Sequence, residues 1–430
     1  MAHVVVVGAG LAGARTCAEL RASGFDGHLL LVGAEQDEPY DRPPLTKDPG
    51  AEVGLAEVMG LDVHALADEV RLGTGARGLR SSPDGLQLDL SDRPVRADAV
   101  VVATGAEPVL PADWAGAGVH VLHTRREAAG LWAQVRPGTR LEVVGGGWIG
   151  CEAAATAATR GARVRLREAA DQLLPGKVPA EVAQRVQAWL AGVGVEVRVA
   201  APVRGVAPAP RAAGVSVAGS TGAADLVLVG LGVRPSTAWL AGTGLALSSS
   251  GAILVDAWGR AGVPGVAAVG DAAARWSARS GRHLPGGHWT EALNAPHALA
   301  PALVEWLAGG ADPRDWRAAP GPDPFDPVPY VFSDIGGRTL QVLGDAGLQA
   351  PTDGVVWRES GSGWSAFRVD AEGRLLGVAS TGRPRDVAMV RRILGDAGSE
   401  GIRVDRAALA DPDAPPDRIR AAAAVLGAEG

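Results

Sequence analysis

The chain has 430 residues, of which 47% are hydrophobic and 21% are charged, and it carries a formal net charge of −7. This composition is typical of a globular protein with two or three domains, and the acidic balance argues against nucleic acid as the main partner. No apolar run reaches the roughly 18 residues that a membrane span requires, and Met1 leads directly into a predicted strand. We therefore expect a cytoplasmic protein that binds neither nucleic acid nor membrane, either a monomer or a homodimer.

The N-terminal segment predicts a dinucleotide-binding unit. A run of valines is followed by Gly8, Gly10 and Gly13 and then by an alanine-rich helix. In such a strand, turn and helix, the first glycine makes the turn, the second lets the backbone approach a pyrophosphate, and the third lets the helix pack on the strand. A buried strand is expected at Gly27–Val32, and Glu35 follows it where a carboxylate can hold a ribose hydroxyl.

The segment Pro39–Lys47 reads Pro-Tyr-Asp-Arg-Pro-Pro-Leu-Thr-Lys. Its prolines predict an extended, rigid loop that presents Arg42 and Lys47 from a fixed support. Lys47 and Lys177 are the only lysines among 41 basic residues, so a lysine retained inside a motif indicates a function. Further on, a predicted buried strand ends at Thr104 and Gly105, a small-residue turn beside which a cofactor can lie.

The same pattern returns about 140 residues later. A predicted strand precedes Gly145, Gly147 and Gly150, and a helical segment carries Glu152 at the end of the motif Val-Val-Gly-Gly-Gly-Trp-Ile-Gly-Cys-Glu. The next strand leads to Glu168, where a carboxylate can accept two ribose hydroxyls. Two copies in one chain predict two nucleotide sites, the arrangement that brings a flavin and a nicotinamide together.

The fold expected from these elements is α/β, with two Rossmann-like dinucleotide-binding domains and a C-terminal α+β domain that contains an antiparallel sheet. We expect an FAD-binding domain at 1–112 and 235–318, an NAD(P)H-binding domain at 113–234, and a C-terminal reductase domain at 319–430. The two cysteines, Cys17 and Cys151, form no CxxC pair, so we expect helix packing and no redox dithiol. No metal site is expected.

The whole chain resembles the FAD-dependent ferredoxin reductases of bacterial oxygenase systems, which are members of the pyridine nucleotide-disulfide oxidoreductase-like superfamily. The matching motifs occur in order along the sequence. They are the first glycine motif, the loop that ends in Leu-Thr-Lys, Ala-Thr-Gly-Ala, the second glycine motif, Gly-Val-Arg-Pro-Ser-Thr beginning at Gly232, Val-Gly-Asp, His-Trp, and Gly-Arg-Pro-Arg-Asp-Val.

By this resemblance, Lys47 and Glu152 form an ion pair near the flavin N5, the atom that accepts hydride. A cation there stabilises the anionic reduced ring, and a carboxylate keeps the lysine in place. Trp148 matches an aromatic lid over the flavin that moves aside for the nicotinamide; the alternative is a core aromatic residue. Gly232 is assigned to the cofactor-binding residues.

The resemblance assigns Asp271 to the ribityl and phosphate region of FAD and Trp289 to the pyrimidine side of its ring. Glu168 favours NADH, because a carboxylate repels the 2′-phosphate of NADPH. Arg165 and Arg167 leave the alternative open, since a neighbouring arginine is how NADPH enzymes accommodate that phosphate. NADPH is therefore the less favoured nucleotide.

The chain departs from the family at several positions. Val109 and His123 stand where the family has arginines that help to hold FAD, so we expect either weaker FAD binding or the use of Arg125 in their place. Pro296 and Pro301 fall in a segment that is normally one helix after His-Trp, so this helix must kink or start later.

The resemblance implies an NAD(P)H-dependent, FAD-containing ferredoxin reductase that passes electrons from NADH through FAD to an iron–sulfur ferredoxin, which in turn feeds an oxygenase. An arginine-rich patch near the flavin edge is the expected docking face, because ferredoxins are acidic. Two alternatives stay open. One is an NADH oxidase or tailoring oxidoreductase that reduces oxygen or a small molecule; the other is a redox-sensing flavoprotein similar to the apoptosis-inducing factors.

Overall fold

The computed structural model describes residues 1–47, 53–82, 85–208, 214–219, 223–317, 323–345, 352–396, 401–414 and 416–420. The chain forms two compact units, and each unit is built from three separate segments. Unit 1 consists of Met1–Pro44, Gly50–Pro108 and Val233–Asp326, and unit 2 consists of Leu45–Pro49, Val109–Gly232 and Pro327–Gly430. Among the helices of these described ranges, none is both long and apolar enough to cross a membrane.

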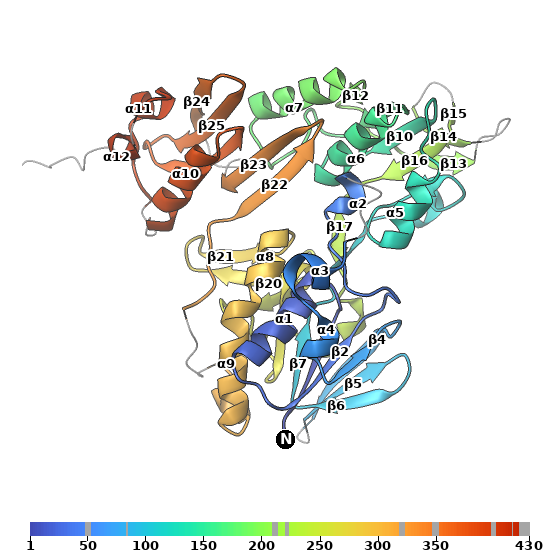
Figure 1. Ribbon diagram of the computed structural model, residues 1–430, viewed down its shortest axis with the longest axis vertical. Helices are drawn as coiled ribbons and strands as arrows, with labels where there is room; N and C mark the ends of the chain where they lie inside the picture. The colour runs from blue at the N-terminus through green and yellow to red at the C-terminus, as the bar shows by residue number, and fades with distance from the viewer. Residues whose placement is uncertain are drawn as a thin grey trace, which may run out of the picture. The chain divides into compact units, whose positions relative to one another are not determined.

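Unit 1 contains a five-stranded parallel sheet in the order β19-β7-β1-β2-β3. Figure 1 labels two of its strands, β2 and β7. Its strands carry almost continuous apolar sequence because both faces are buried. Val4 and Val6 of β1 pack toward the helices α1 and α9, whereas Val5 and Val7 pack toward a small antiparallel sheet, β4-β5-β6. The elements of these layers are β1 (His3–Val7), α1 (Leu11–Ala22), β2 (His28–Val32), β3 (Glu69–Arg71), β4 (Ala76–Ser82), β5 (Gly85–Leu90), β6 (Pro94–Ala97), β7 (Ala99–Val102), β19 (Val266–Ala268) and α9 (Pro296–Ala308).

Unit 1 also contains shorter elements outside its five-stranded sheet. They include a three-stranded sheet, β18-β20-β21, and a two-stranded pair, β17-β8. Their bounds are α3 (Leu55–Met59), α4 (Val63–Leu66), β8 (Ala106–Pro108), β17 (Val233–Pro235), η2 (Ala238–Leu240), β18 (Ile253–Val255), η3 (Gly270–Ala272), β20 (Ala273–Ser277), β21 (Arg282–Pro285), α8 (Trp289–Asn294) and η4 (Pro313–Asp315).

Unit 2 repeats the same plan with the parallel sheet β12-β11-β10-β16-β9. Helices α5, α6 and α7 bury one face of this sheet, and the antiparallel sheet β13-β14-β15 buries the other. The bounds are η1 (Ala112–Trp114), β9 (Val119–His120), α5 (Arg125–Trp132), β10 (Arg140–Val144), α6 (Trp148–Thr159), β11 (Arg163–Arg167), α7 (Ala180–Gly192), β12 (Glu196–Arg198), β13 (Val206–Pro208), β14 (Val215–Val217), β15 (Ala223–Ala224) and β16 (Leu226–Val229).

The C-terminal part of unit 2 is a five-stranded antiparallel sheet in the order β22-β23-β26-β25-β24. Helix α10 packs on β23 and β26, and β22 packs against α6 and α7 (Figure 1). The bounds are β22 (Tyr330–Ile335), β23 (Arg338–Gly344), β24 (Thr352–Ser360), β25 (Gly363–Asp370), β26 (Leu375–Thr381), α10 (Pro384–Asp396), α11 (Arg406–Ala410) and α12 (Pro416–Ile419). The expected fold class is confirmed, whereas the three expected domain boundaries stay a prediction.

Two local expectations involve proline. The loop that ends at Lys47 is not extended throughout, because Pro44–Lys47 forms a helical turn, α2. This part of the prediction was wrong, since proline fits the first turn of a helix, where its missing N–H is not needed. The expectation of an interrupted helix after Trp289 is confirmed: α8 ends at Asn294, and α9 restarts at Pro296 with Pro301 inside it.

Candidate active site

The first glycine turn lies at the carboxyl end of β1, where the strand order of the sheet reverses between β2 and β7. Gly8 has a φ of +116°, and a Cβ there would lie 2.1 Å from the carbonyl oxygen of Ala103. A Cβ on Gly13 would lie 1.8 Å from the carbonyl oxygen of Gly8. A Cβ on Gly10, in contrast, would meet no protein atom within 4 Å among the described residues.

The second glycine turn, after β10, obeys the same steric rule. Gly145 has a φ of +110°, and its Cβ would lie 2.2 Å from the carbonyl oxygen of Gly230. A Cβ on Gly150 would lie 2.0 Å from the carbonyl oxygen of Gly145, whereas a Cβ on Gly147 meets nothing within 4 Å in the part of the chain described. Protein packing therefore requires the first and third glycine of each motif but not the middle one.

The middle glycines are the N-cap residues of α1 and α6. Neither Gly10 nor Gly147 can cap its helix with a side chain, and neither helix has an acidic residue in its first turn. Backbone N–H groups at such an end bind phosphate, and an open Cα lets a pyrophosphate approach the backbone. The residues of both units thus fit a dinucleotide.

Glu35 follows β2 in unit 1 and is held in place by two side chains. Its Oε2 accepts a hydrogen bond of 2.7 Å from the hydroxyl of Tyr40, and its Oε1 accepts one of 2.6 Å from Arg42. The guanidinium of Arg42 also lies 5.4 Å from the centre of the Tyr40 ring. The structure therefore brings Glu35 and Arg42 together, as a fixed carboxylate at the expected ribose position.

Asp271 and Trp289 also belong to unit 1. Burial raises the pKa of Asp271, and this effect is opposed by the charge of Arg42 and by a hydrogen bond from the backbone N–H of Gly287. The indole N–H of Trp289 donates a hydrogen bond of 2.9 Å to Asp41, in the same loop as Arg42. Asp271 is therefore electrostatically coupled to Arg42, and Trp289 is anchored to the loop that carries it.

Thr104 and Gly105 form the turn after β7. The Thr104 hydroxyl donates to the carbonyl oxygen of Ser236 at 2.8 Å. The backbone N–H of Ser236 donates to the carbonyl oxygen of Gly105 at 2.9 Å. Gly105 has a φ of +68°, which a residue with a Cβ rarely adopts. Both predicted residues thus lie in one fixed turn within unit 1.

Glu168 follows β11 and contacts the second glycine turn directly. Its Oε2 accepts a hydrogen bond of 2.7 Å from the N–H of Gly146, and its Oε1 accepts one of 2.8 Å from the N–H of Ala170. This places a carboxylate beside the glycine turn, at the position expected for a ribose ligand.

Arg165 and Arg167 are engaged elsewhere. Arg165 pairs with Glu196 at 3.1 Å and Glu142 at 3.6 Å. Arg167 is 7% exposed and donates to the carbonyl oxygens of Ala201, Pro202 and Ala218. These contacts hold both arginines against the strands and loops beside β11. This arrangement favours the carboxylate of Glu168 as the group that binds the ribose hydroxyls.

Lys47 and Glu152 lie together in unit 2, as expected, at an Nζ–Oε1 distance of 3.6 Å. Glu152 is 7% exposed and accepts three hydrogen bonds: from the Thr46 hydroxyl at 2.5 Å, from the Ser333 hydroxyl at 2.5 Å, and from the Asp334 backbone N–H at 3.1 Å. Its two oxygens are therefore satisfied in a buried network that joins α2, α6 and β22.

Among the described residues, the carboxylate nearest to Lys47 is that of Asp334, which the sequence did not single out. Lys47 Nζ lies 2.9 Å from Asp334 Oδ2 and 4.8 Å from the centre of the Phe332 ring. Burial alone would raise the pKa of Asp334, but hydrogen bonds from Thr339 and Lys47 outweigh it and lower that pKa. Lys47 is thus held by two carboxylates and an aromatic face.

The remaining predicted residues of unit 2 lie on three different elements. Trp148 starts α6 and packs partly against the core, and its indole N–H is buried without a hydrogen-bond partner among the described residues. Arg125 is the first residue of α5. Gly232 has a φ of +97°, and its carbonyl oxygen accepts the N–H of Val109. Their expected roles toward a cofactor stay predictions.

Both cysteines are buried thiols. Burial raises the pKa of Cys17 to about 12, and burial also raises the pKa of Cys151, whose thiol donates to the carbonyl oxygen of Gly146 at 3.4 Å. Neither is a thiolate near neutral pH, and they belong to different units. No cluster of potential metal ligands occurs in the described residues.

A family model described as pyridine nucleotide-disulphide oxidoreductase matches residues 2–296, and one described as reductase C-terminal matches residues 330–418. The chain belongs to the pyridine nucleotide-disulphide oxidoreductase family. This membership makes the protein an oxidoreductase with FAD and NADH as cofactors. The thiol chemistry in the family name has no counterpart here, because the two buried cysteines cannot form a redox pair.

Several proteins that resemble the chain over nearly its whole length are named as ferredoxin reductases or putidaredoxin reductase. The ferredoxin–NAD(+) reductase component of the p-cumate 2,3-dioxygenase system from Pseudomonas putida is 32% identical over 421 residues, covering 96% of this chain and 98% of the relative. The crystal structure of Fdr9 is 36% identical with a TM-score of 0.82, covering 98% and 100% of the two chains. A covalent putidaredoxin reductase–putidaredoxin complex is 27% identical with a TM-score of 0.82, covering 97% of each chain.

Proposed function

We propose that the chain transfers electrons from NADH, through FAD, to an iron–sulfur ferredoxin that feeds an oxygenase. The observation that carries this proposal is the match to ferredoxin reductases over nearly the whole chain, including the C-terminal sheet. The buried cysteines support it, because a reductase without a dithiol has no two-electron protein relay. When bound, NADH supplies an electron pair and FAD releases it one electron at a time.

In this proposal, unit 1 holds FAD. Gly8, Gly10 and Gly13 give the pyrophosphate its cradle, and Glu35 accepts the ribose hydroxyls while Tyr40 and Arg42 keep it oriented. Further contacts come from Arg42, Thr104, Gly105, Asp271 and Trp289. The anchoring hydrogen bond from Trp289 to Asp41 supports its assignment as a rigid flank for the ring.

Unit 2 holds NADH around its own glycine turn. Gly145, Gly147 and Gly150 cradle the pyrophosphate, and Glu168 accepts the ribose hydroxyls and disfavours a 2′-phosphate. The buried, unpartnered indole N–H of Trp148 supports a role for this residue toward a cofactor, because a buried donor needs an acceptor. Arg125 and Gly232 complete the proposed set.

Lys47 is the proposed cation that stabilises the reduced flavin. Glu152 and Asp334 hold its ammonium group from two sides, and Phe332 lies under it. Two carboxylates on one lysine fix the direction of its ammonium group. The ion pair inferred from the family thus becomes a three-residue arrangement, in which Asp334 is a positioning residue.

The acceptor is proposed to dock on an arginine-rich face, because acidic ferredoxins associate faster with a basic surface. We also propose that the protein works in the cytoplasm, as a monomer or homodimer, and that it contacts the oxygenase only through the ferredoxin. Three domains, with the boundaries expected above, complete the proposal.

The test is NADH-driven reduction of cytochrome c by the purified full chain, with and without added ferredoxin. We expect a yellow protein with about one FAD per chain and a rate that depends strongly on ferredoxin. Rapid peroxide formation without ferredoxin dependence would instead support an oxidase. A colourless protein that takes up no FAD would refute the assignment. Lys47→Ala should slow flavin reduction, and the matched control Lys177→Ala, at an exposed lysine, should not.

A further inference from the structure

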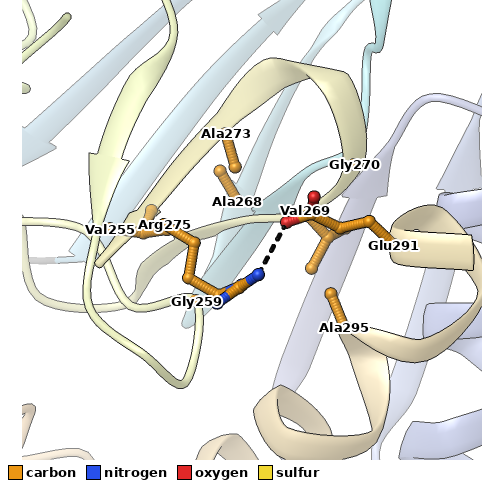
Figure 2. A pocket seen from close by; sticks show the side chains of 9 residues that line it. All are labelled: Val255, Gly259, Ala268, Val269, Gly270, Ala273, Arg275, Glu291 and Ala295. Atoms are coloured by element: carbon orange, nitrogen blue, oxygen red, sulfur yellow. Dashed lines mark hydrogen bonds and ion pairs between the residues drawn. The ribbon is translucent and has the colours of Figure 1, made fainter. Parts of the chain in front are cut away.

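A buried acid–base pair lies next to the loop that carries Asp271. Arg275, on β20, is 5% exposed, and Glu291, on α8, has a side chain that is 14% exposed. Their side chains point toward each other across a small cavity that Gly270 and Val255 also line, as Figure 2 shows. Arg275 NH2 donates to Glu291 Oε1 at 3.2 Å. This pair has no role in the site described above.

The loop beside the pair is closely packed on two sides. Gly270 has a φ of +62°, and a Cβ there would lie 3.0 Å from the Cβ of Ala12 on α1. On its other side, a Cβ on Gly286 would lie 2.3 Å from the carbonyl oxygen of Gly270 and 3.0 Å from the Cα of Asp271. Helix α8, which carries Glu291, also packs on this loop at η3 (Gly270–Ala272), next to Asp271.

The guanidinium compensates the Glu291 carboxylate only partly. Arg275 donates its shortest hydrogen bond, 2.5 Å, to the carbonyl oxygen of Phe325, and it lies 3.9 Å from Asp326. Its buried Nε–H has no acceptor among the described residues. Burial, opposed by Arg275 and increased by the charge of Asp271, raises the pKa of Glu291 to about 7. Glu291 therefore changes charge near neutral pH.

The charged groups that face Glu291 come from two elements. Arg275 on β20 favours the ionised form, and Asp271 on η3 opposes it. The neighbouring helices α1 and α9 carry Arg15, Glu19 and His297, which pair with one another at 2.6 to 2.9 Å. These three groups are paired among themselves, whereas Glu291 and Asp271 are two acids beside one loop.

We propose that Arg275 and Glu291 form a proton-dependent support for the Asp271 loop, so that FAD binds more tightly when Glu291 is protonated. This inference rests on the proposed role of Asp271 at the FAD site. Ionised Glu291 adds a second negative charge beside Asp271, and FAD itself carries negative phosphates. Binding of FAD should therefore take up a proton, and its affinity should fall as the pH rises. Glu291 acts here as a positioning residue.

The experiment measures the FAD dissociation constant of the full chain, after removal and re-addition of FAD, by flavin fluorescence between about pH 5.5 and 8.5. We expect the affinity of the wild-type protein to fall about tenfold over this range, which corresponds to one pKa unit of linkage. Glu291→Gln mimics the protonated acid and should bind FAD with little pH dependence. Glu291→Asp should keep a pH dependence, and Glu305→Gln, at an exposed glutamate on α9, should behave like the wild type.

Proton uptake gives a second readout. In weakly buffered solution near neutral pH, FAD binding should consume protons in the wild type and not in Glu291→Gln. Equal pH dependence in these two proteins, or none in the wild type, would overturn the inference while leaving the proposed function intact. Absence of FAD binding at every pH would refute both. Should Glu291→Gln fail to fold, the wild-type and Glu291→Asp profiles decide, and flat profiles in both would be contrary to the proposal.

Discussion

The buried carboxylate of Glu152 allows hydrogen bonding and charge to be separated experimentally. Glu152→Ala removes the acceptor of three hydrogen bonds, from Thr46, from Ser333 and from the backbone of Asp334. At ~1 kcal/mol per hydrogen bond, the free energy of unfolding should fall by about 3 kcal/mol. The loss of the Lys47 contact adds little, because Lys47 keeps Asp334 at 2.9 Å.

Glu152→Gln should be much milder. Its amide oxygen can replace Oε1, which accepts from Ser333 and from the backbone N–H of Asp334. Its NH2 group then faces the Thr46 hydroxyl, which can rotate to accept instead of donate. All three hydrogen bonds survive and Lys47 keeps Asp334 at 2.9 Å, so we expect a loss of about 1 kcal/mol, smaller than for Glu152→Ala.

The assay is urea denaturation of the full chain followed by circular dichroism, in which the midpoint shifts and the slope is unchanged. Repeating it at tenfold higher FAD separates a change in cofactor affinity from a change in the protein. Glu181→Ala, at an exposed glutamate of α7, is the matched control and should cost about 1 kcal/mol or less. A loss as large for Glu152→Gln as for Glu152→Ala would show that charge dominates and would refute the hydrogen-bond reasoning.

Four further predictions concern other parts of the molecule. Wild-type catalytic efficiency should favour NADH over NADPH by a factor of about ten or more, and Glu168→Ala should narrow that ratio; equal wild-type efficiencies would contradict this assignment. Lys47→Ala should lower the flavin midpoint potential in a redox titration, and an unchanged potential would remove Lys47 from the flavin's surroundings. A thiol reagent should modify Cys17 and Cys151 only after denaturation; rapid labelling of the native protein would disprove their burial. Because folding raises the pKa of Glu291, its neutral form stabilises the protein below its unfolded pKa, and this stabilisation is lost as the pH rises toward about 7. The melting temperature of the wild type should fall over this window relative to Glu291→Gln, and parallel curves would contradict the shift.

The third glycine of each motif was predictable because its constraint is local. A Cβ on Gly13 would meet the carbonyl oxygen of Gly8 inside the same motif, so the spacing of these two glycines in the sequence reports the turn itself. The steric limit on Gly8, in contrast, comes from Ala103 at the end of another strand, and only the folded sheet shows it. The pairing of Lys47 with Glu152 was accessible only through the family resemblance, since no local pattern connects positions so far apart. The scarcity of lysine nevertheless indicated that Lys47 was special.

Asp334 and Ser333 could not be found in this way. They lie on β22, in a C-terminal sheet without a nucleotide motif, and their partner Glu152 is about 180 residues away. A polar residue in an alternating strand normally faces solvent, so Asp334 carried no signal. Ser333 differs from Asp334, because the structure shows that it is only 1% exposed, and a buried hydroxyl needs a hydrogen-bond partner.

The sequence also could not predict where the side chains of Arg165 and Arg167 point. Arg165 and Arg167 stand beside Glu168 in the chain, and this proximity left NADPH open as an alternative. The structure ties both to partners outside the glycine turn, because residues two apart on β11 share one face of the sheet and both meet Glu142 on β10. Only the pairing of the strands determines this outcome.

The division of unit 1 into three chain segments has a consequence for synthesis on the ribosome. Strand β7 leaves the ribosome long before β19, its parallel partner at Val266–Ala268. At the usual rate of roughly 5–20 residues per second, β7 presents an unpaired edge for on the order of ten seconds. The parallel sheet of unit 2 lies entirely within Val109–Gly232 and is complete before β19 is made. The parallel sheet of unit 2 can thus form first, whereas the N-terminal sheet is complete only after β19 has been synthesised.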